Sequence, residues 1–287
     1  MKRKILLPLF SLALFSFTIS SDKPAYQIFD AKGKKSSYEK MLKDAKEADI
    51  VLFGELHNNP IVHWLQLELT NDLYEVKKSN LVLGAEMFEA DDQIPLNEYL
   101  QGKISDKTLK DEAKLWPNFS TDYKPLLDFA KENHIPFVAA NIPRRYANMV
   151  YSKGLGRLDS IDVDAKRWIA PLPMKYDTSL KCYKDIFAAA GGHGGENLPK
   201  SQAIKDATMS YFILKNWSKG KMFIHYNGSY HSNNHQGIEW YLKQEKPELK
   251  IFTIAAVQQS NLDTLAKESF DLGNYILCTP DDMTKTH

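Results

Sequence analysis

A short apolar run that ends at a glycine and leads into charged side chains constrains this fold most. Residues 50–53 are all apolar, which predicts a buried strand, and Gly54 ends the run. The Asn-Asn-Pro sequence at 58–60 fits the cap and first turn of a helix. Ligands of open α/β sheets bind beyond the carboxyl ends of the strands, which is where this crossing lies. The crossing carries one carboxylate and two imidazoles, those of Glu55, His57 and His63.

The same arrangement recurs late in the chain. A second apolar strand is predicted to end near Gly228, and two asparagines then precede a helix. Both places read Gly-x-x-His after an apolar strand, at 54–57 and at 228–231. One such motif is weak, but two copies at the carboxyl ends of strands are a better signal. If the two strands are parallel neighbours, His57 and His231 converge at one edge of the sheet.

Strands alternate with helices along almost the whole chain. A small hairpin is expected at 26–34 and a polar, interrupted helical region at 91–114. We expect further strands at 81–88, 135–140, 249–257 and 274–278, and helices at 38–46, 60–78, 121–133, 198–217 and 237–246. The pattern fails at 154–199, which predicts a long connection that is either a functional lid or a mobile loop. The sequence therefore predicts an α/β fold with a mainly parallel sheet, helices on both faces and a site at the carboxyl edge of the strands.

The first 21 residues have the pattern of a secretory signal peptide. Basic residues at 2–4 precede an apolar stretch at 5–19, and two serines follow. The apolar stretch is short for a bilayer span, which needs about 20 residues. We expect export to a periplasm-like space or beyond, without a lipid anchor, because no cysteine lies near the cleavage region. Residues 22–287 are then expected to form a single α/β domain.

Composition argues against nucleic acid as a partner and leaves open whether the two cysteines form a disulfide. The net charge is only +1, and no cluster of lysine and arginine is interleaved with aromatic residues, so nucleic acid is not an expected partner. The two cysteines, Cys182 and Cys278, are able to pair in an oxidising compartment, and the sequence leaves that pairing open.

Imidazole and carboxylate side chains gather at the predicted sheet edge. They form the ligand set of zinc, iron or manganese, and imidazole also binds haem iron. Plainer alternatives exist, with His57 as a turn histidine bonded to backbone and Glu86 as a capping acid or a partner of Arg144. We place a shared site ahead of these alternatives. The predicted metal ligands are Glu55, His57, Glu86 and His231.

Three more side chains lie close to the ends of predicted strands. Arg144 follows the strand at 135–140, where a guanidinium suits carboxylates or propionates, or simply begins a solvated helix. Tyr226 and Tyr230 flank the second turn. A tyrosinate is able to bind ferric haem, although most tyrosines in such a strand pack against their neighbours.

Other features are assigned no role. Lys205 and Asp206 fall on a predicted helix, where such residues are more often surface charge than catalyst. His193 lies among four glycines, which favours a mobile loop residue over an imidazole delivered by a lid. The chain has neither a Gly-x-Ser-x-Gly nucleophile elbow nor a phosphate-binding loop.

The order and spacing of several short motifs point to a known group. These motifs are Gly54-Glu55-Leu56-His57-Asn58-Asn59-Pro60 with His63, then Glu86, Asn141-Ile142-Pro143-Arg144, Gln202-Ala203-x-Lys205-Asp206-Ala207-Thr208-Met209 and Gly228-x-x-His231. The chain resembles, over about residues 49–257, the ChaN-like haem-binding proteins of the wider Tiki/erythromycin-esterase-like superfamily.

The resemblance implies an exported haem-binding protein involved in haem or iron uptake. It also implies a homodimer that shares haem, and an outer-membrane or periplasmic haem-transport partner. The family includes lipoproteins, whereas this chain lacks the cysteine that would accept the lipid. The residues expected to bind haem are His57, His63, Arg144, Tyr226, Tyr230 and His231, and the aromatic residues expected to line its slot are Trp64, Phe88, Trp116 and Tyr226.

Two other hypotheses remain open. The wider superfamily includes metal-dependent hydrolases, in which a zinc, manganese or iron ion activates water. Glu55 or Glu86 would then act as base or ligand, and His57 and His231 as ligands or general base. The third hypothesis is a secreted interaction domain without a cofactor. The sequence does not decide the axial haem ligand or whether any reaction is catalysed.

Overall fold

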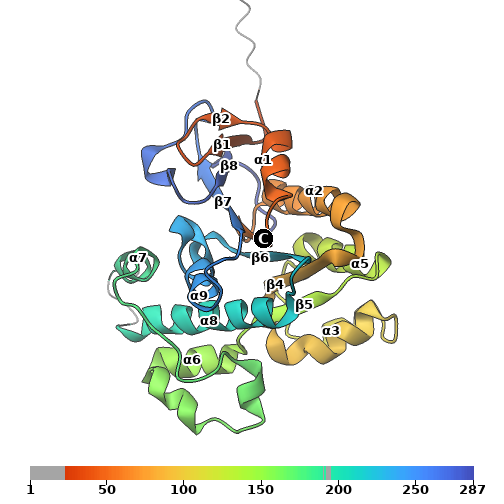
Figure 1. Ribbon diagram of the computed structural model, residues 1–287, viewed down its shortest axis with the longest axis vertical. Helices are drawn as coiled ribbons and strands as arrows, with labels where there is room; N and C mark the ends of the chain where they lie inside the picture. Colours follow the sequence, from red (N-terminus) through yellow and green to blue (C-terminus); the bar gives the residue numbers. More distant parts are fainter. Residues whose placement is uncertain (1–22, 190, 192–194) are drawn as a thin grey trace, which may run out of the picture.

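One sheet forms the centre of the structure, and most of its strands run parallel (Figure 1). The computed structural model describes residues 23–189, 191 and 195–287, so the predicted signal peptide and His193 lie outside the described residues. The strands are β1 (Gln27–Asp30), β2 (Lys35–Ser36), β3 (Ile50–Glu55), β4 (Leu81–Glu89), β5 (Phe137–Asn141), β6 (Met222–Gly228), β7 (Ile251–Gln259) and β8 (Tyr275–Pro280). They lie in the order β2-β1-β8-β7-β3-β6-β4-β5, and β1 alone pairs in antiparallel fashion, with β2 and β8.

Helices cover both faces of this sheet, as predicted. One face packs against α1 (Tyr38–Ala45), α2 (Pro60–Lys77), α3 (Gln93–Leu100), α4 (Asp106–Glu112) and α5 (Lys124–Glu132). The other packs against α8 (Asn197–Asn216) and α9 (Ile238–Glu245), while α6 (Arg144–Lys153) and α7 (Lys181–Ala189) pack on α8. None of the described helices is long and apolar enough to cross a membrane. The predicted α/β fold is confirmed.

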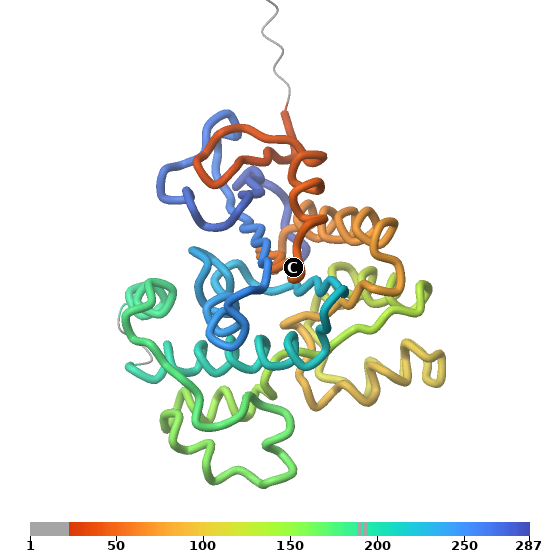
Figure 2. The backbone as a smooth tube through the Cα atoms, in the orientation of Figure 1, coloured from red at the N-terminus to blue at the C-terminus, as the bar shows by residue number. Residues whose placement is uncertain are grey.

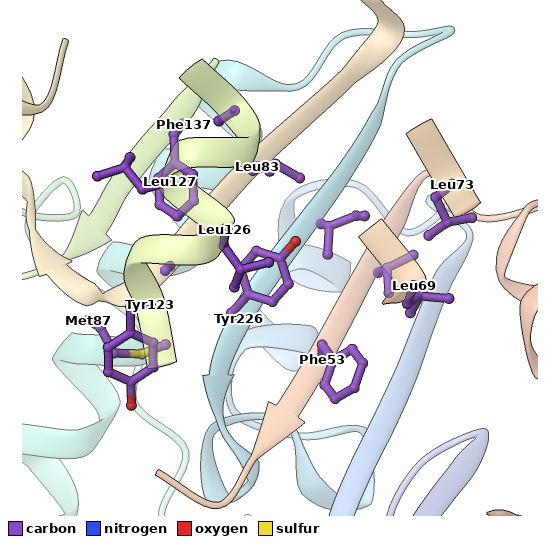
Figure 3. Packing of buried hydrophobic residues seen from close by; sticks show 14 of the residues in the cluster. Phe53, Leu69, Leu73, Leu83, Met87, Tyr123, Leu126, Leu127, Phe137 and Tyr226 are labelled. Carbon is purple, nitrogen blue, oxygen red and sulfur yellow. The ribbon is translucent and has the colours of Figure 1, made fainter. Parts of the chain in front are cut away.

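The apolar run of β3 is continuous because both faces of this strand are covered. Val51 and Phe53 join the cluster beneath α2, whereas Ile50 and Leu52 join the cluster beneath α8 and α9. Successive side chains of a strand point to opposite faces, so a strand buried on both sides has no polar alternation. Figure 3 shows Phe53 near Leu69 of α2 in the first cluster.

The two Gly-x-x-His turns leave neighbouring strands at the same level. β3 and β6 pair in parallel over their whole length, with Ile50 opposite Phe223 and Glu55 opposite Gly228. The next helix begins where the sequence predicts, because the Asn59 side chain accepts hydrogen bonds from the backbone N–H groups of residues 61 and 62 and Pro60 starts the first turn. The predicted convergence of the two turns is therefore confirmed.

The connection predicted at 154–199 is more helical than expected. It contains two short 3-10 segments at 155–160 and 165–168, then α7 and the first residues of α8. In α7 only Cys182 and Tyr183 are buried among the side chains that the structure describes. Two buried residues do not produce the long apolar stripe by which an amphipathic helix is recognised in a sequence.

The two cysteines do not form a disulfide. Cys182 lies in α7 and Cys278 in β8, and both are buried free thiols. The pairing that the sequence left open is therefore absent from this structure.

The outer edge of β5 is closed by a side chain in place of another strand. Gln93, at the start of α3, donates a hydrogen bond to the carbonyl of Phe137 (3.0 Å) and accepts one from the N–H of Ala139 (2.7 Å). An unpaired strand edge is otherwise a template for pairing with another chain. The amide of Gln93 satisfies the two backbone groups that a neighbouring strand would bind.

We expect Gln93→Ala to lower the free energy of unfolding by about 1–3 kcal/mol, because it leaves a buried N–H and a buried carbonyl unpaired. Urea unfolding followed by circular dichroism measures the change. Gln101→Ala is the matched control, since Gln101 is exposed and should change stability by less than about 0.5 kcal/mol. Equal unfolding midpoints for the two variants would contradict this role of Gln93.

Candidate functional site

A cavity of about 640 Å³ lies beyond the carboxyl ends of β3, β6, β4 and β5, and we call it the first cavity. Loops and helices that follow these strands complete its walls. Its lining includes His57, Glu86, Glu89, Trp116, Asn141, Arg144, Gln202, Lys205, Gly228, Tyr230 and His231. Polar groups of both charges therefore line a hollow at the position where open α/β sheets bind their ligands.

A second cavity, of about 590 Å³, lies beyond β3, β6 and β7. It shares His57, Gly228 and Tyr230 with the first cavity, so these residues lie between the two hollows. Tyr230 is 65% exposed, which leaves its ring accessible to a ligand. Both cavities fall within the size range of small-molecule sites in proteins, which is about 300–1,000 Å³.

Glu55 holds the first Gly-x-x-His turn, at 54–57, through its bond to His57. It is buried at the end of β3 and accepts three hydrogen bonds, from Nδ1 of His57 (2.8 Å), the Tyr123 hydroxyl (2.9 Å) and the Gln66 amide (2.7 Å). These donors satisfy both oxygens of the carboxylate. Because a carboxylate only accepts, Nδ1 of His57 carries a proton.

His57 is the most accessible imidazole of the site. Its side chain is 39% exposed, and Nε2 has no hydrogen-bond partner among the described residues. Burial opposes protonation, but the hydrogen bond to Glu55 and the charge of Glu86 outweigh it and raise the pKa of His57. The ring also packs edge-on against Trp116, with ring centroids 4.8 Å apart.

Gly228 is required for this close approach. A Cβ atom at position 228 would lie 2.8 Å from Nε2 of His57 and 3.5 Å from Oε2 of Glu86. The backbone N–H of Gly228 donates to the same Oε2 atom at 2.7 Å. Any side chain here would push the imidazole of His57 away from the end of β6.

His231 forms the centre of a buried charged chain. Its Nδ1 lies 2.5 Å from Oδ1 of Asp206, and its Nε2 lies 3.1 Å from Oε1 of Glu86. The Tyr183 hydroxyl donates to the other oxygen of Asp206 at 2.8 Å. Both ring nitrogens therefore face carboxylate oxygens, an arrangement that favours the doubly protonated imidazolium.

The charges of this chain follow from the same contacts. Burial opposes the charge on His231, but Glu86 and Asp206 outweigh it and raise the pKa of His231 to about 10. Burial likewise opposes the ionised form of Glu86, yet His231 holds its pKa far below the usual range. Burial raises the pKa of Asp206, while the hydrogen bonds from His231 and Tyr183 stabilise its carboxylate form. The floor of the first cavity is therefore an ionic network at neutral pH.

The segment after β8 returns to the first turn, near the centre of the molecule (Figure 2). Thr286 donates its N–H to the carbonyl of Asn58 (3.0 Å) and its hydroxyl to Asp122 (2.7 Å). Asn118 in turn donates to Asp122 (2.6 Å) and to the carbonyl of His57 (2.7 Å). The backbone that presents His57 is thus held by groups from two distant parts of the chain, residue 286 and the 118–122 segment.

Comparison with known proteins identifies this arrangement. Residues 41–242 match the family described as haem-binding uptake, Tiki superfamily, ChaN, and this is more than half of the chain. The chain belongs to this family. The resemblance to the ChaN family that the sequence motifs indicated is confirmed.

The fold is similar to that of a solved structure. The structure of ChaN of Campylobacter jejuni with cofacially bound haem matches with a TM-score of 0.66 and 20% identity, over 88% of this chain and 96% of that one. The type III effector HopBA1 matches with a TM-score of 0.47 and 12% identity, over 84% of this chain and 92% of that one, which is too weak to support an argument.

A plant protein shares part of the sequence. Protein RETICULATA-RELATED 5, chloroplastic, of Arabidopsis thaliana is 29% identical over 130 residues, which are 43% of this chain. The match spans only 17% of that protein's length.

Four of the six residues predicted to bind haem line the first cavity of this ChaN-family protein, namely His57, Arg144, Tyr230 and His231. Trp116 also lines it. Glu86 pairs with His231, and not with Arg144, which the sequence offered as an alternative partner. Neither nitrogen of His231 is free to bind a ligand, because both face carboxylates.

Tyr226 does not lie at this site, so its predicted role is wrong. It is fully buried on the face of β6 that packs on α2, and its hydroxyl lies 2.5 Å from that of Thr70 in α2. It packs in the same cluster as Met222 and Ile224, with which it shares a face of the strand. Figure 3 shows Tyr226 among the residues of this cluster. Phe88 is buried in this cluster as well, and Trp64 is exposed on α2 next to Tyr26, so neither lines the cavity.

His63 lies behind the first turn and does not line either cavity. It is 6% exposed, with Nδ1 facing Gln66 (3.2 Å) and Nε2 facing the carbonyl of His57 (3.3 Å) and Asp122 (3.4 Å). These contacts make it a support for the backbone of His57, and burial keeps it away from a ligand.

The predicted metal set is not assembled as a metal site. Glu55 and His57 bind each other, and Glu86 and His231 bind each other. Within the described part of the chain, no three His, Cys, Asp or Glu side chains converge in an arrangement that could hold a metal ion. The four residues are neighbours, but each carboxylate is already bonded to an imidazole.

Sequence reasoning missed residues that α8 brings to the site. Asp206 and Lys205 were expected to be surface charges, yet Asp206 is 1% exposed and bonded to His231, and Lys205 lines the first cavity. A signal existed, since Asp206 is flanked by the apolar Ala203 and Ala207 positions that mark the buried face of this helix.

We expect His231→Gln to destabilise the protein by about 3–5 kcal/mol near neutral pH, because it leaves two buried carboxylates without their cation. The folded pKa of His231, about 10, exceeds the usual value of 6.5. Its contribution to stability is therefore complete below pH 6.5 and is lost as the pH rises towards 10. The difference between wild type and variant in urea unfolding should shrink from pH 6.5 to pH 9.5.

His235→Gln is the matched control for this experiment. His235 pairs with Glu239 at 2.9 Å, but its side chain is 37% exposed, so its removal should cost less than about 1 kcal/mol. A His231→Gln effect that stays constant across this pH range would show that the imidazolium is not what stabilises the site.

Proposed function

We propose that this protein binds haem in the first cavity, with the iron held from the wall formed by His57 and Tyr230. The observation that carries the proposal is the state of His57. Its Nδ1–H is held by a buried carboxylate, while Nε2 has no partner among the described residues. Metal-binding histidines commonly donate their second N–H to a carboxylate in this way, which orients the ring and increases its basicity.

Tyr230 supplies the second ligating atom of the same wall. Its side chain is 65% exposed between the two cavities, and its hydroxyl has no hydrogen-bond partner among the described residues. Histidine and tyrosine are both established axial ligands of haem iron. Nε2 of His57 lies close to the end of β6, whereas Tyr230 projects outward, so the two would approach a macrocycle from different positions.

The remaining lining suits the rest of a haem molecule. Trp116 and the ring of Tyr230 offer aromatic surface for a flat macrocycle. Arg144 and Lys205 line the same cavity and supply cations for the propionates. The cavity and its donors therefore fit haem, which brings the iron and its porphyrin nitrogens, while the chain supplies orientation, an axial atom and charge.

We further propose that the protein is exported, and that it takes up haem as a homodimer and exchanges it with an outer-membrane or periplasmic transport partner. Residues 1–21 support export by their basic, apolar and small-residue pattern. The exposure of Tyr230 supports a second subunit, which would cover a face that the single chain leaves open. The haem in ChaN of Campylobacter jejuni is bound cofacially, which also supports the dimer.

The described residues do not support the alternative of a metal-dependent hydrolase. Its zinc, manganese or iron ion needs three protein ligands and an open position. The described residues place no such group of ligands together.

Haemin titration of the chain from residue 22 onward tests the axial ligand. We expect a saturable, shifted Soret band, and we expect the variant that removes the axial ligand, His57→Ala or Tyr230→Phe, to bind about 10- to 100-fold more weakly. The matched controls are His235→Ala and Tyr151→Phe, which remove side chains of the same types that line neither cavity. If both His57→Ala and Tyr230→Phe bind haemin like wild type, the proposed wall is wrong.

Esterified haem tests the role of the cations. We expect Arg144→Gln and Lys205→Gln each to weaken haemin binding about 3- to 10-fold, because each removes one partner of a propionate. The same variants should bind haem dimethyl ester as well as wild type does, because the ester carries no charge there. Arg145→Gln is the matched control, since Arg145 binds Asp91 and does not line the cavity. Equal losses for haemin and its ester would contradict recognition of the propionates.

A further inference from the structure

Helix α7 forms part of the wall of both cavities. Ile186 lines the first cavity, and Lys181, Cys182 and Asp185 line the second. Figure 1 shows α7 at the edge of the molecule, beside α8 and α9. A single short helix therefore closes one side of each hollow.

The packing that holds α7 is small. Its buried residues, Cys182 and Tyr183, form a cluster with Ala203 of α8 that is separate from the two clusters on the faces of the sheet. Phe187 is 40% exposed. A segment with few buried apolar contacts opens at a lower free energy than the core does.

Two hydrogen bonds tie α7 to the site. The Tyr183 hydroxyl donates to Oδ2 of Asp206 at 2.8 Å, and the backbone N–H of Cys182 donates to the side chain of Gln236 at 2.8 Å. Asp206 holds His231 through its other oxygen. Among the described residues, Tyr183 is thus the side chain of α7 that joins the helix to the ionic floor of the first cavity.

Gln236 is in turn fixed by the turn that follows His231. The next residue, Gly237, has a positive φ of 57°, and a Cβ atom there would lie 2.3 Å from the carbonyl oxygen of His231 and 3.2 Å from Asp206. Both anchors of α7 therefore belong to the same tightly packed corner, around Asp206 and His231. If the Tyr183–Asp206 bond breaks, α7 loses its link to the ionic floor, while His231 keeps its contacts with Asp206 and Glu86.

We infer that α7 is a movable wall of the two cavities and that the Tyr183–Asp206 hydrogen bond is its latch. With the latch closed, α7 covers a bound ligand, and with the latch open the ligand enters and leaves. The inference that this ligand is haem rests on the proposed function, whereas the movement itself does not.

The native cysteines report this movement without added labels. They are the only two in the chain, and both are buried, one in α7 and one in β8. Cys182 also lines the second cavity, so reagent reaches it from that cavity or by opening of α7, whereas Cys278 is reached on global unfolding. Iodoacetamide labelling followed by peptide mass spectrometry, without haemin, should therefore modify Cys182 at least about tenfold faster than Cys278.

Tyr183→Phe tests the latch by removing only the hydroxyl. We expect labelling of Cys182 to become about tenfold faster or more, since a hydrogen bond to a charged group is lost, while labelling of Cys278 stays unchanged. Tyr176→Phe is the matched control, because Tyr176 packs on Tyr183 with ring centroids 5.7 Å apart and its hydroxyl makes no hydrogen bond among the described residues. Equal labelling of the two cysteines in wild type, or equal acceleration of both in Tyr183→Phe, would overturn the inference.

Haemin provides a second test, which needs no variant. Saturating haemin should slow labelling of Cys182 at least about tenfold and leave Cys278 unchanged, because bound ligand holds the wall closed. Binding of haemin without any change at Cys182 would overturn the link between α7 and the ligand. Faster labelling of Cys182 in Tyr183→Phe than in wild type, in a protein that does not bind haemin, would instead leave the movable wall standing and reject the proposed function.

Discussion

The parallel pairing of β3 with β6 is the constraint on which the site depends. Because Glu55 lies opposite Gly228, the two Gly-x-x-His turns leave the sheet at one level and on adjacent strands. The pairing also places the N–H of Gly228 where Glu86, from β4 on the other side of β6, accepts its hydrogen bond. Three neighbouring strands are thereby joined through side chains beyond their last backbone hydrogen bonds. A shift of one residue in the register would move Gly228 away from His57 and place a Cβ atom where the imidazole now lies.

Buried charge makes this arrangement rigid. Ionised groups are costly to bury unless each has partners, and here every buried carboxylate of the site has them. Glu55 accepts bonds from His57, Tyr123 and Gln66, and Glu86 and Asp206 share the imidazolium of His231. In such a network, removal of one partner leaves the others uncompensated, so the groups keep their positions together. Nε2 of His57 is not used by the network, and it faces the cavity that the network supports.

The sequence predicted the elements of the sheet and the convergence of the turns because both depend on local patterns, namely apolar runs, glycines and helix caps. It did not place Asp206, since the direction of a charged helical residue depends on where α8 packs on the sheet. Tyr226 was assigned to the site because it precedes Gly228 closely, although its alternation with Met222 and Ile224 puts it on the face that packs on α2. The helical segment α7 escaped detection because its packing involves two buried residues and a hydrogen bond to a residue 23 positions away.

The same network bears on the choice between haem and a bare metal ion. A structural or catalytic ion takes three or four ligands from the protein. In this site the carboxylates and imidazoles are already bonded to one another, and freeing three of them would leave buried charges without partners. Haem iron arrives with four nitrogen ligands from the porphyrin and needs only one or two atoms from the chain. A wall with one free imidazole nitrogen and one exposed phenol satisfies that smaller requirement, so the ionic floor is able to orient the ligand without being dismantled by it.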